Sequence, residues 1–384
     1  MDRGQYSNLL EVFAARPDPR KARGKRPSWG LIVTLIGAAL VSGERGLRAM
    51  SQWVGERREE LCEALHPPRR RLPSDATLRR ALRVLDVADL EARAAALVRA
   101  TPATAPRPGD VPEPLGLAMD GKKINGANAH GAQVHLLSLT RHDDARVVRQ
   151  REVAAKSNEI PAAPQLLAGL DLTGVVVTMD ALLTQRAIAA QIRRQRGHYL
   201  MVAKENQPTL HAAIARIFTE GVIPWPTDHA AQHTTVERGH GRVETRTLER
   251  TAALNDYLDW PDVGQVLRRT YHAVNCQTGA VWQEVHYGLT SLPAATSTPA
   301  QVERLWRGHW TIENRVHYVR DVTFGEDAGQ AWVGNTPHAL ATLRNLLLAL
   351  LRAHGRTNIA DALRHYGAYA HRAIALLAAS PPRL

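Results

Sequence analysis

Three acidic residues stand where their side chains could act together on a phosphodiester. Asp120 ends the apolar run LGLAMD, Asp180 ends the run VVVTMD, and Glu313 lies in a segment with helical periodicity. Carboxylate oxygens suit Mg²⁺ and Mn²⁺, and a pair of such ions both neutralises a scissile phosphate and activates a nucleophile near neutral pH. We therefore predict that the three acids bind two divalent ions. Either aspartate taken alone is better explained as a turn or cap residue, so the prediction depends on all three.

The elements around the two aspartates predict a mixed α/β sheet covered by helices. Three strands are followed by a helix, a strand, a helix and a strand, which is the order of a ribonuclease-H-like fold. Side chains at the ends of neighbouring parallel strands converge on one rim of the sheet, where ligands usually bind. The expected strands are 115–120, 133–140, 145–153, 175–180 and 198–204, with helices at 157–170 and 184–196.

The third acid belongs to a predicted helix that starts at Pro299 and continues through residue 321. Trp306, His309, Glu313, His317 and Arg320 recur at helical spacing and share one face. This face is expected to pack on the sheet and direct Glu313 to its rim. Arg320 would then bind a phosphate through two of its guanidinium nitrogens. His309 would contact DNA or a metal-bound water. The alternative is an aromatic face that makes core contacts only.

The segments before, between and after these elements predict a helical N-terminal domain, a β-rich insertion and C-terminal helices. Residues 1–105 read as helical, with helices at 29–43, 47–65 and 76–100, and a proline-rich linker follows at 101–114. A helix at 207–220 and β-rich residues from about 231 to 292 suggest an insertion, and helices at 336–354 and 357–379 close the chain. The expected units are a helical N-terminal domain (1–105), a catalytic core (115–205 and 295–330), an insertion (206–294) and C-terminal helices (331–384).

Charge favours a polyanionic partner. The 384 residues include 49 Lys and Arg against 37 Asp and Glu, a formal charge of +12, although a GC-rich genome would also enrich arginine. Cys62 and Cys276 are the only cysteines, which argues against a disulfide framework or thiolate metal site and fits a reducing cytoplasm. The longest apolar run, 31–41, is too short to span a bilayer.

Several motifs together resemble one known family. They are Pro17–Arg20, AMDGKK at 118–123, VVVTMDALLTQ, VAKENQ at 202–207 and HWTIENRVHYVRDVTFGED. The chain resembles the bacterial insertion-sequence transposases of the H-repeat-associated group, in the DDE superfamily with a β-insertion before the catalytic glutamate. The likeness covers roughly residues 9–375.

The resemblance implies that Asp120, Asp180 and Glu313 are the catalytic and metal-binding residues. It implies an enzyme that cuts DNA at element ends and then uses the freed 3′-hydroxyl to attack target DNA. Its partners would be the terminal repeats and the target DNA, with a homodimer in the synaptic complex. Such a protein would work in the bacterial cytoplasm near the nucleoid, without a membrane. Asn125 departs from the family, which often has arginine there.

Other basic residues are expected to contact DNA. Lys122, Lys123 and Lys204 follow the predicted strand ends and would hold the DNA backbone, although ordinary surface lysines are equally consistent. Arg242, in the segment His240-Gly241-Arg242, would touch DNA or simply form a hairpin turn.

Glu326 and Asp327 are rivals for the third acid. They rank below Glu313 because Gly325 is expected to end the helix before them. Two other functions also remain open. One is a DNA-binding protein without catalysis, such as a degenerate transposase copy, and the other is a nuclease that cuts without joining.

Overall fold

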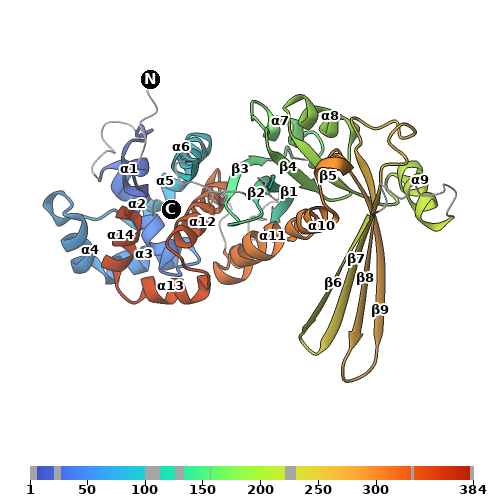
Figure 1. The fold of residues 1–384 in the computed structure, drawn as a ribbon. Helices are drawn as coiled ribbons and strands as arrows, with labels where there is room; N and C mark the ends of the chain where they lie inside the picture. The colour runs from blue at the N-terminus through green and yellow to red at the C-terminus, as the bar shows by residue number, and fades with distance from the viewer. Residues whose placement is uncertain are drawn as a thin grey trace, which may run out of the picture.

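The computed structural model describes residues 7–20, 27–99, 113–125, 134–155, 157–220, 231–329 and 333–380. A helical body lies beside a sheet with helices on its faces, and a long ribbon of strands projects away from the sheet (Figure 1). Most of the predicted linker at 101–114 falls outside the described residues.

The sheet contains nine strands among the described residues, in the order β3-β2-β1-β4-β5-β9-β8-β7-β6. The pairs β1–β4 and β4–β5 are parallel, whereas the other neighbours are antiparallel. The first five strands confirm the predicted ribonuclease-H-like order. The strands are β1 (Leu115–Ile124), β2 (Val134–Arg141), β3 (Val147–Glu152), β4 (Val175–Met179), β5 (His198–Ala203), β6 (Ala231–Gly239), β7 (Arg242–Thr251), β8 (Gln265–Asn275) and β9 (Val281–Thr290).

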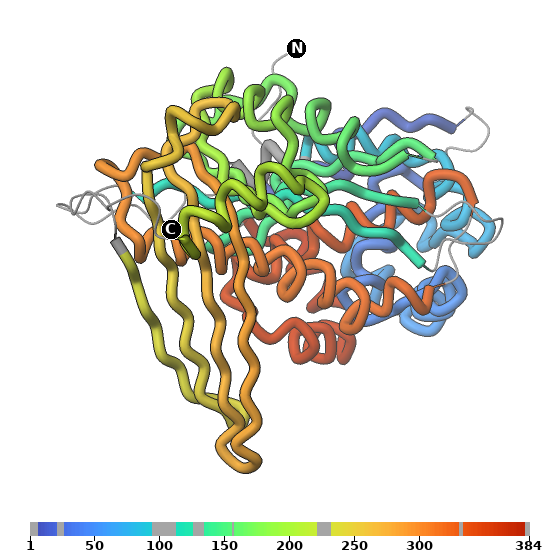
Figure 2. Tube along the Cα trace, turned by 90° about the vertical axis from the view of Figure 1, so that its right-hand side faces the viewer, coloured from blue at the N-terminus to red at the C-terminus, as the bar shows by residue number. Residues whose placement is uncertain are grey.

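The β-rich insertion is part of the same sheet. Strand β9 pairs with β5 from Leu200↔Thr290 to Ala203↔Tyr287, so the insertion extends the core sheet through its last strand. Beyond this junction β6 to β9 continue as the projecting ribbon, which Figures 1 and 2 show from two sides. The base of the ribbon is therefore fixed against the core strands.

Helices bury the apolar residues on both faces of the core sheet. Helices α7 (Ala162–Leu167), α8 (Arg186–Arg194) and α9 (Pro208–Thr219) cover the face that carries Met119 and Val177. Helix α10 (Pro299–Gly308) covers the opposite face through Val302, Leu305 and Trp306. Helix α7 is shorter than predicted because it begins only after Pro161, whose ring fixes the entry to the first turn.

The glutamate-bearing helix continues from α10 without leaving helical geometry. Thr298 and Gln301 form a capping box at its start, and α11 (Trp310–Ile312) follows α10. Two π-helical stretches come next, η5 (Glu313–His317) and η6 (Val319–Thr323). The predicted extent of 299–321 is close to the observed one, but the α-helical winding expected after Ile312 is wrong.

The helical body combines the two ends of the chain. Residues of the N-terminal helices and of the C-terminal helices form one hydrophobic core, in which α2 is apolar and buried along nearly its whole length. The segments predicted as single helices at 47–65, 76–100 and 357–379 are each two helices. The helices are α1 (Leu9–Ala14), α2 (Trp29–Val41), α3 (Leu47–Glu56), α4 (Arg58–Leu65), α5 (Asp75–Val84), α6 (Val87–Arg99), α12 (Thr336–Ala353), α13 (Ile359–Gly367) and α14 (Ala370–Ala378), with short 3₁₀ turns η2 (Pro68–Arg70) and η4 (Ala294–Thr296).

Within the described part of the chain, none of the helices combines the length and the apolar character needed to cross a membrane.

A glycine at the ribbon base allows α10 to approach the sheet closely. A Cβ on Gly288 would lie 2.7 Å from Cη2 of Trp306 and 2.8 Å from the backbone oxygen of Met201. We expect Gly288→Ala to lower the free energy of unfolding by about 1–3 kcal/mol, as overpacking of a core does. Urea denaturation measures this loss. Gly239→Ala is the control, because a Cβ there meets nothing within 4 Å; equal stability of the two variants would contradict the packing argument.

Candidate active site

A pocket of about 410 Å³ lies where the core strands, the glutamate-bearing helix and the ribbon base meet. All three acids predicted from the sequence line it, and they come from three elements far apart in the chain. The lining residues are Asp120, Thr178, Met179, Asp180, Ala181, Leu200, Val202, Lys204, Arg269, His286, Trp306, His309, Trp310, Ile312 and Glu313.

The two aspartates are brought together by strand register. Met119 of β1 pairs with Met179 of β4 in parallel, so Asp120 and Asp180 are the next residues of two adjacent strands. Strand β4 ends there, and Oδ1 of Asp180 accepts a hydrogen bond from the backbone N–H of Leu183 at 3.1 Å. Backbone pairing therefore places the two aspartates at the same rim of the sheet, as expected.

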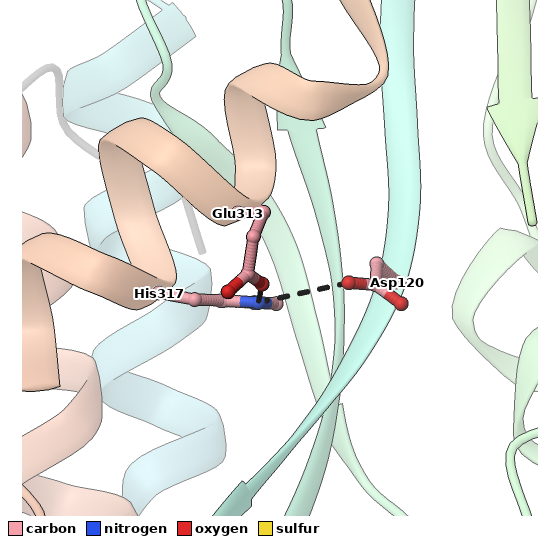
Figure 3. A group of neighbouring side chains, drawn as sticks. All are labelled: Asp120, Glu313 and His317. Carbon is pink, nitrogen blue, oxygen red and sulfur yellow. Dashed lines mark hydrogen bonds and ion pairs between the residues drawn. The ribbon is translucent and has the colours of Figure 1, made fainter. Parts of the chain in front are cut away.

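Glu313 approaches Asp120 from the helix that crosses the sheet. Figure 3 shows Glu313 and His317, one helical turn apart, facing Asp120 on β1. One side-chain ligand atom from each of these three residues lies within 4.8 Å of the other two. Asp180 lines the same pocket but lies outside this group.

Burial makes the charges of the aspartates costly. The pKa of Asp120 is raised to about 7, mainly by burial and then by repulsion from Glu159. Burial, with Glu159 again adding, also raises the pKa of Asp180. By contrast, the hydrogen bond from His317 lowers the pKa of Glu313. Oxygen ligands gathered with unfavourable negative charge fit a divalent cation.

Glu159 is an acid near the site that sequence reasoning missed. It is buried in the loop before α7, and its Oε1 lies 2.9 Å from Nε2 of His135. A Cβ on Gly121 would lie only 2.1 Å from that same oxygen, so the glycine next to Asp120 makes room for Glu159. The glycine in AMDGKK was the only signal in the sequence, and it does not identify the acid.

His309 is part of a buried hydrogen-bonded chain in the pocket wall. The Thr178 hydroxyl lies 3.0 Å from Nε2 of His142 and 3.2 Å from Nδ1 of His309. Burial lowers the pKa of both histidines to about 4, so both imidazoles are neutral near pH 7. His309 therefore does not offer the positive charge that a phosphate contact would use.

The prediction that Arg320 grips a phosphate is not supported. Its side chain is fully buried and both Nε and Nη2 donate to the Glu326 carboxylate, which also accepts from Nη1 of Arg344 at 3.0 Å. The π-helical winding explains the error. A π turn contains more residues than the 3.6 of an α-helix, so the α-helical spacing used in the prediction does not place Arg320 on the side of Glu313.

Lys122 also has a structural partner in place of DNA. Its Nζ lies 2.6 Å from Oδ2 of Asp321, and the residue is only 8% exposed. The side chain of Asn125 donates to Asp327 at 3.0 Å. Both rival acids are thus engaged, Glu326 with two arginines and Asp327 with Asn125, which favours Glu313 as the third acid.

The other predicted DNA contacts remain predictions. Lys123 and Lys204 are exposed, and Lys204 lines the pocket close enough to Asp180 to oppose the rise in its pKa. Arg242 lies at the turn between β6 and β7, where it pairs with Glu244.

The ribbon contributes two pocket residues that the sequence did not indicate. Arg269 of β8 and His286 of β9 line the pocket, and Nε of Arg269 lies 3.0 Å from Oε2 of Glu303 on α10. Their place depends on the register between β8 and β9, which local periodicity does not specify.

The buried cluster of Glu326 with Arg320 and Arg344 gives a stability test that distinguishes Glu326 from Glu313. Glu326→Gln leaves two buried guanidinium groups without the carboxylate that pairs with both, so we expect a loss of about 3–5 kcal/mol in unfolding free energy. Glu313→Gln removes a half-exposed carboxylate and should cost less than about 1 kcal/mol. Chemical denaturation of both variants measures the difference. A stable Glu326→Gln protein would mean that this ion cluster is not needed for the fold.

The raised pKa of Asp120 predicts the pH dependence of cation binding. Because the cation binds the carboxylate, a proton must leave Asp120 below pH 7, and Mn²⁺ affinity should fall by about tenfold per pH unit there. Above pH 7 the affinity should level off. Titration calorimetry at pH 6 and pH 8 tests this, with Asp120→Asn as the control that removes the titrating group. An affinity that is flat across this range would contradict the assignment.

The chain matches two protein families and several known proteins. Residues 95–362 match the family described as Transposase DDE domain, and residues 10–98 match a second family described as DDE_Tnp_1-associated. YncI of Escherichia coli O157:H7, named as a candidate transposase, is 30% identical over 244 residues, which are 62% of this chain and 61% of that protein. An uncharacterised protein from the dhlA 3′ region of Xanthobacter autotrophicus is 34% identical over 256 residues, 66% of this chain and 82% of that protein.

A third relative carries the H-repeat name. YhhI of Escherichia coli K12, an H repeat-associated candidate transposase, is 28% identical over 242 residues, 61% of this chain and 63% of that protein. The matched region spans less than two thirds of the length of YncI and YhhI.

Proposed function

Because the chain belongs to the Transposase DDE domain family, we propose that it is the transposase of a bacterial insertion sequence. The family match confirms the resemblance drawn from the sequence motifs. In this proposal the protein cuts DNA at the ends of the element and joins the freed 3′-hydroxyl to target DNA. The observation that carries the proposal is the convergence of Asp120, Asp180 and Glu313 on one pocket at the end of the core strands.

The three acids would hold two Mg²⁺ or Mn²⁺ ions, since carboxylate oxygens are the ligands these cations prefer. When bound, such ions neutralise the charge on the phosphate and lower the pKa of a bound water. In cleavage, a water oxygen attacks phosphorus and the bond to the 3′-oxygen breaks, which leaves a 3′-hydroxyl. In joining, that hydroxyl attacks a target phosphodiester and again displaces a 3′-oxygen. The same carboxylates serve both displacements.

The remaining pocket residues would position the DNA. Lys204 stands beside Asp180 and would pair with a backbone phosphate, as would the exposed Lys123 next to the site. Arg242 would meet DNA further out along the ribbon. The charge of +12 supports a DNA partner, and a homodimer would hold two element ends together in the cytoplasm.

Asp120→Asn keeps the size of the side chain but removes the charge. We expect cleavage of a duplex that carries the terminal repeat to fall by about 10³-fold or more, because a cation ligand is lost. DNA affinity measured by gel shift should stay within a few-fold. Asp256→Asn is the matched control, since Asp256 is exposed outside the pocket. Undiminished cleavage by Asp120→Asn would refute the proposed site.

Labelled element ends distinguish the proposal from its two alternatives. Mg²⁺-dependent cleavage followed by joined product is the expected result for wild-type protein, with none in EDTA. Free ends without any joined product would indicate a nuclease. Retained DNA binding without cleavage would indicate a non-catalytic copy.

A further inference from the structure

We propose that His317 is a positioning residue that fixes the Glu313 carboxylate toward Asp120 through a hydrogen bond from Nδ1. The inference deepens the proposed function and rests on it for its catalytic consequence. The helical spacing places His317 on the same face as Glu313 but predicts no role for it.

The geometry places one imidazole nitrogen between two acids. Nδ1 of His317 lies 3.0 Å from Oε2 of Glu313 and 3.6 Å from Oδ2 of Asp120. Dashed lines mark the two contacts in Figure 3. The histidine side chain is only 4% exposed, whereas that of Glu313 is 52% exposed. A rigid buried ring therefore holds a carboxylate that would otherwise sample several rotamers in solvent.

The contacts also determine which nitrogen carries the proton. An ionised carboxylate only accepts hydrogen bonds, so the 3.0 Å contact requires a hydrogen on Nδ1. Nε2 is buried and has no hydrogen-bond partner among the described residues. A proton on Nε2 would be a buried donor without an acceptor there, which is costly. The geometry therefore assigns the tautomer with hydrogen on Nδ1.

The hydrogen bond from His317 fixes the orientation of the Glu313 carboxylate and leaves its negative charge in place. Tyr318 donates its backbone N–H to the Glu313 carbonyl, which fixes the backbone of the π turn, while His317 fixes the side chain. One carboxylate oxygen of Glu313 is occupied by His317 and the other is left for a cation. A histidine nitrogen as a direct ligand is the competing role, although imidazole suits Zn²⁺ or Ni²⁺ better than Mg²⁺.

Two amide substitutions separate these roles. Asparagine carries its amide nitrogen two bonds from Cβ, as histidine carries Nδ1, whereas glutamine carries it three bonds away, as histidine carries Nε2. We expect His317→Gln to weaken Mn²⁺ binding and terminal-repeat cleavage by about 10- to 100-fold, the usual loss when a group that orients a ligand is removed. His317→Asn should restore both to within about threefold of wild type, with the preference for Mg²⁺ over Zn²⁺ unchanged.

Equal losses in the two variants, both folded by circular dichroism, would overturn the proposal. So would a change in the order of metal preference with His317→Asn, because that result would make the histidine a ligand. Wild-type affinity in His317→Gln would overturn it as well.

A spectroscopic measurement tests the tautomer without relying on activity. Long-range ¹H–¹⁵N correlation spectra of metal-free protein with ¹⁵N-labelled histidine should show His317 with hydrogen on Nδ1, assigned by its absence in His317→Asn. The opposite tautomer would refute the proposal even if a variant failed to fold. If the expected tautomer is found but wild-type protein neither binds Mn²⁺ nor cuts DNA, the proposed function fails while the hydrogen bond stands.

Discussion

Repulsion between carboxylates removed from water is the constraint around which this fold is arranged. Burial raises the pKa values of Asp120 and Asp180, and the nearby Glu159 carboxylate raises both further; folding brings the acids together in spite of that. The backbone pairing of β1 with β4 makes the two aspartates neighbours, and apolar side chains on both faces of the sheet stabilise that pairing. A bound cation would relieve the repulsion that packing maintains. Hydrophobic burial thus keeps the carboxylates close together, although their negative charges repel one another.

The position of Glu313 also depends on a buried ion cluster farther along its helix. Its helix continues into η6, where Arg320 turns inward to join Glu326 and Arg344 in a fully buried cluster. The cluster ties the helix to α12, and so connects the pocket to the helical body. Buried ion clusters contribute little net stability, but each member becomes hard to remove once the others are in place. The cluster therefore holds η6 against α12 while it adds little net stability.

Local patterns predicted the core strands, their order and the three acids, since apolar runs and helical periodicity are visible in short windows. Residues whose roles depend on partners far along the chain could not be predicted in the same way. Lys122 was predicted to contact DNA because its partner Asp321 is 199 positions away, and Arg320 was predicted to face a phosphate beside Glu313 because the π winding has no local signature. Arg269 and His286 reach the pocket through strand register alone. The sequence therefore predicted three acids that the structure brings to one pocket, but not the residues that hold them there.

The shared core of the helical body has a consequence for synthesis of the protein. Helices α1 to α6 leave the ribosome first, but α12 to α14, which complete their core, follow only after the entire sheet has been translated. Until then the apolar surface of α2 lacks part of its cover, and such surfaces favour aggregation or proteolysis. A gene copy interrupted within the sheet would yield an N-terminal fragment with an unfinished core. The fragment would expose the apolar residues of α2 that the C-terminal helices cover in the full chain, and such a surface is a target for proteases.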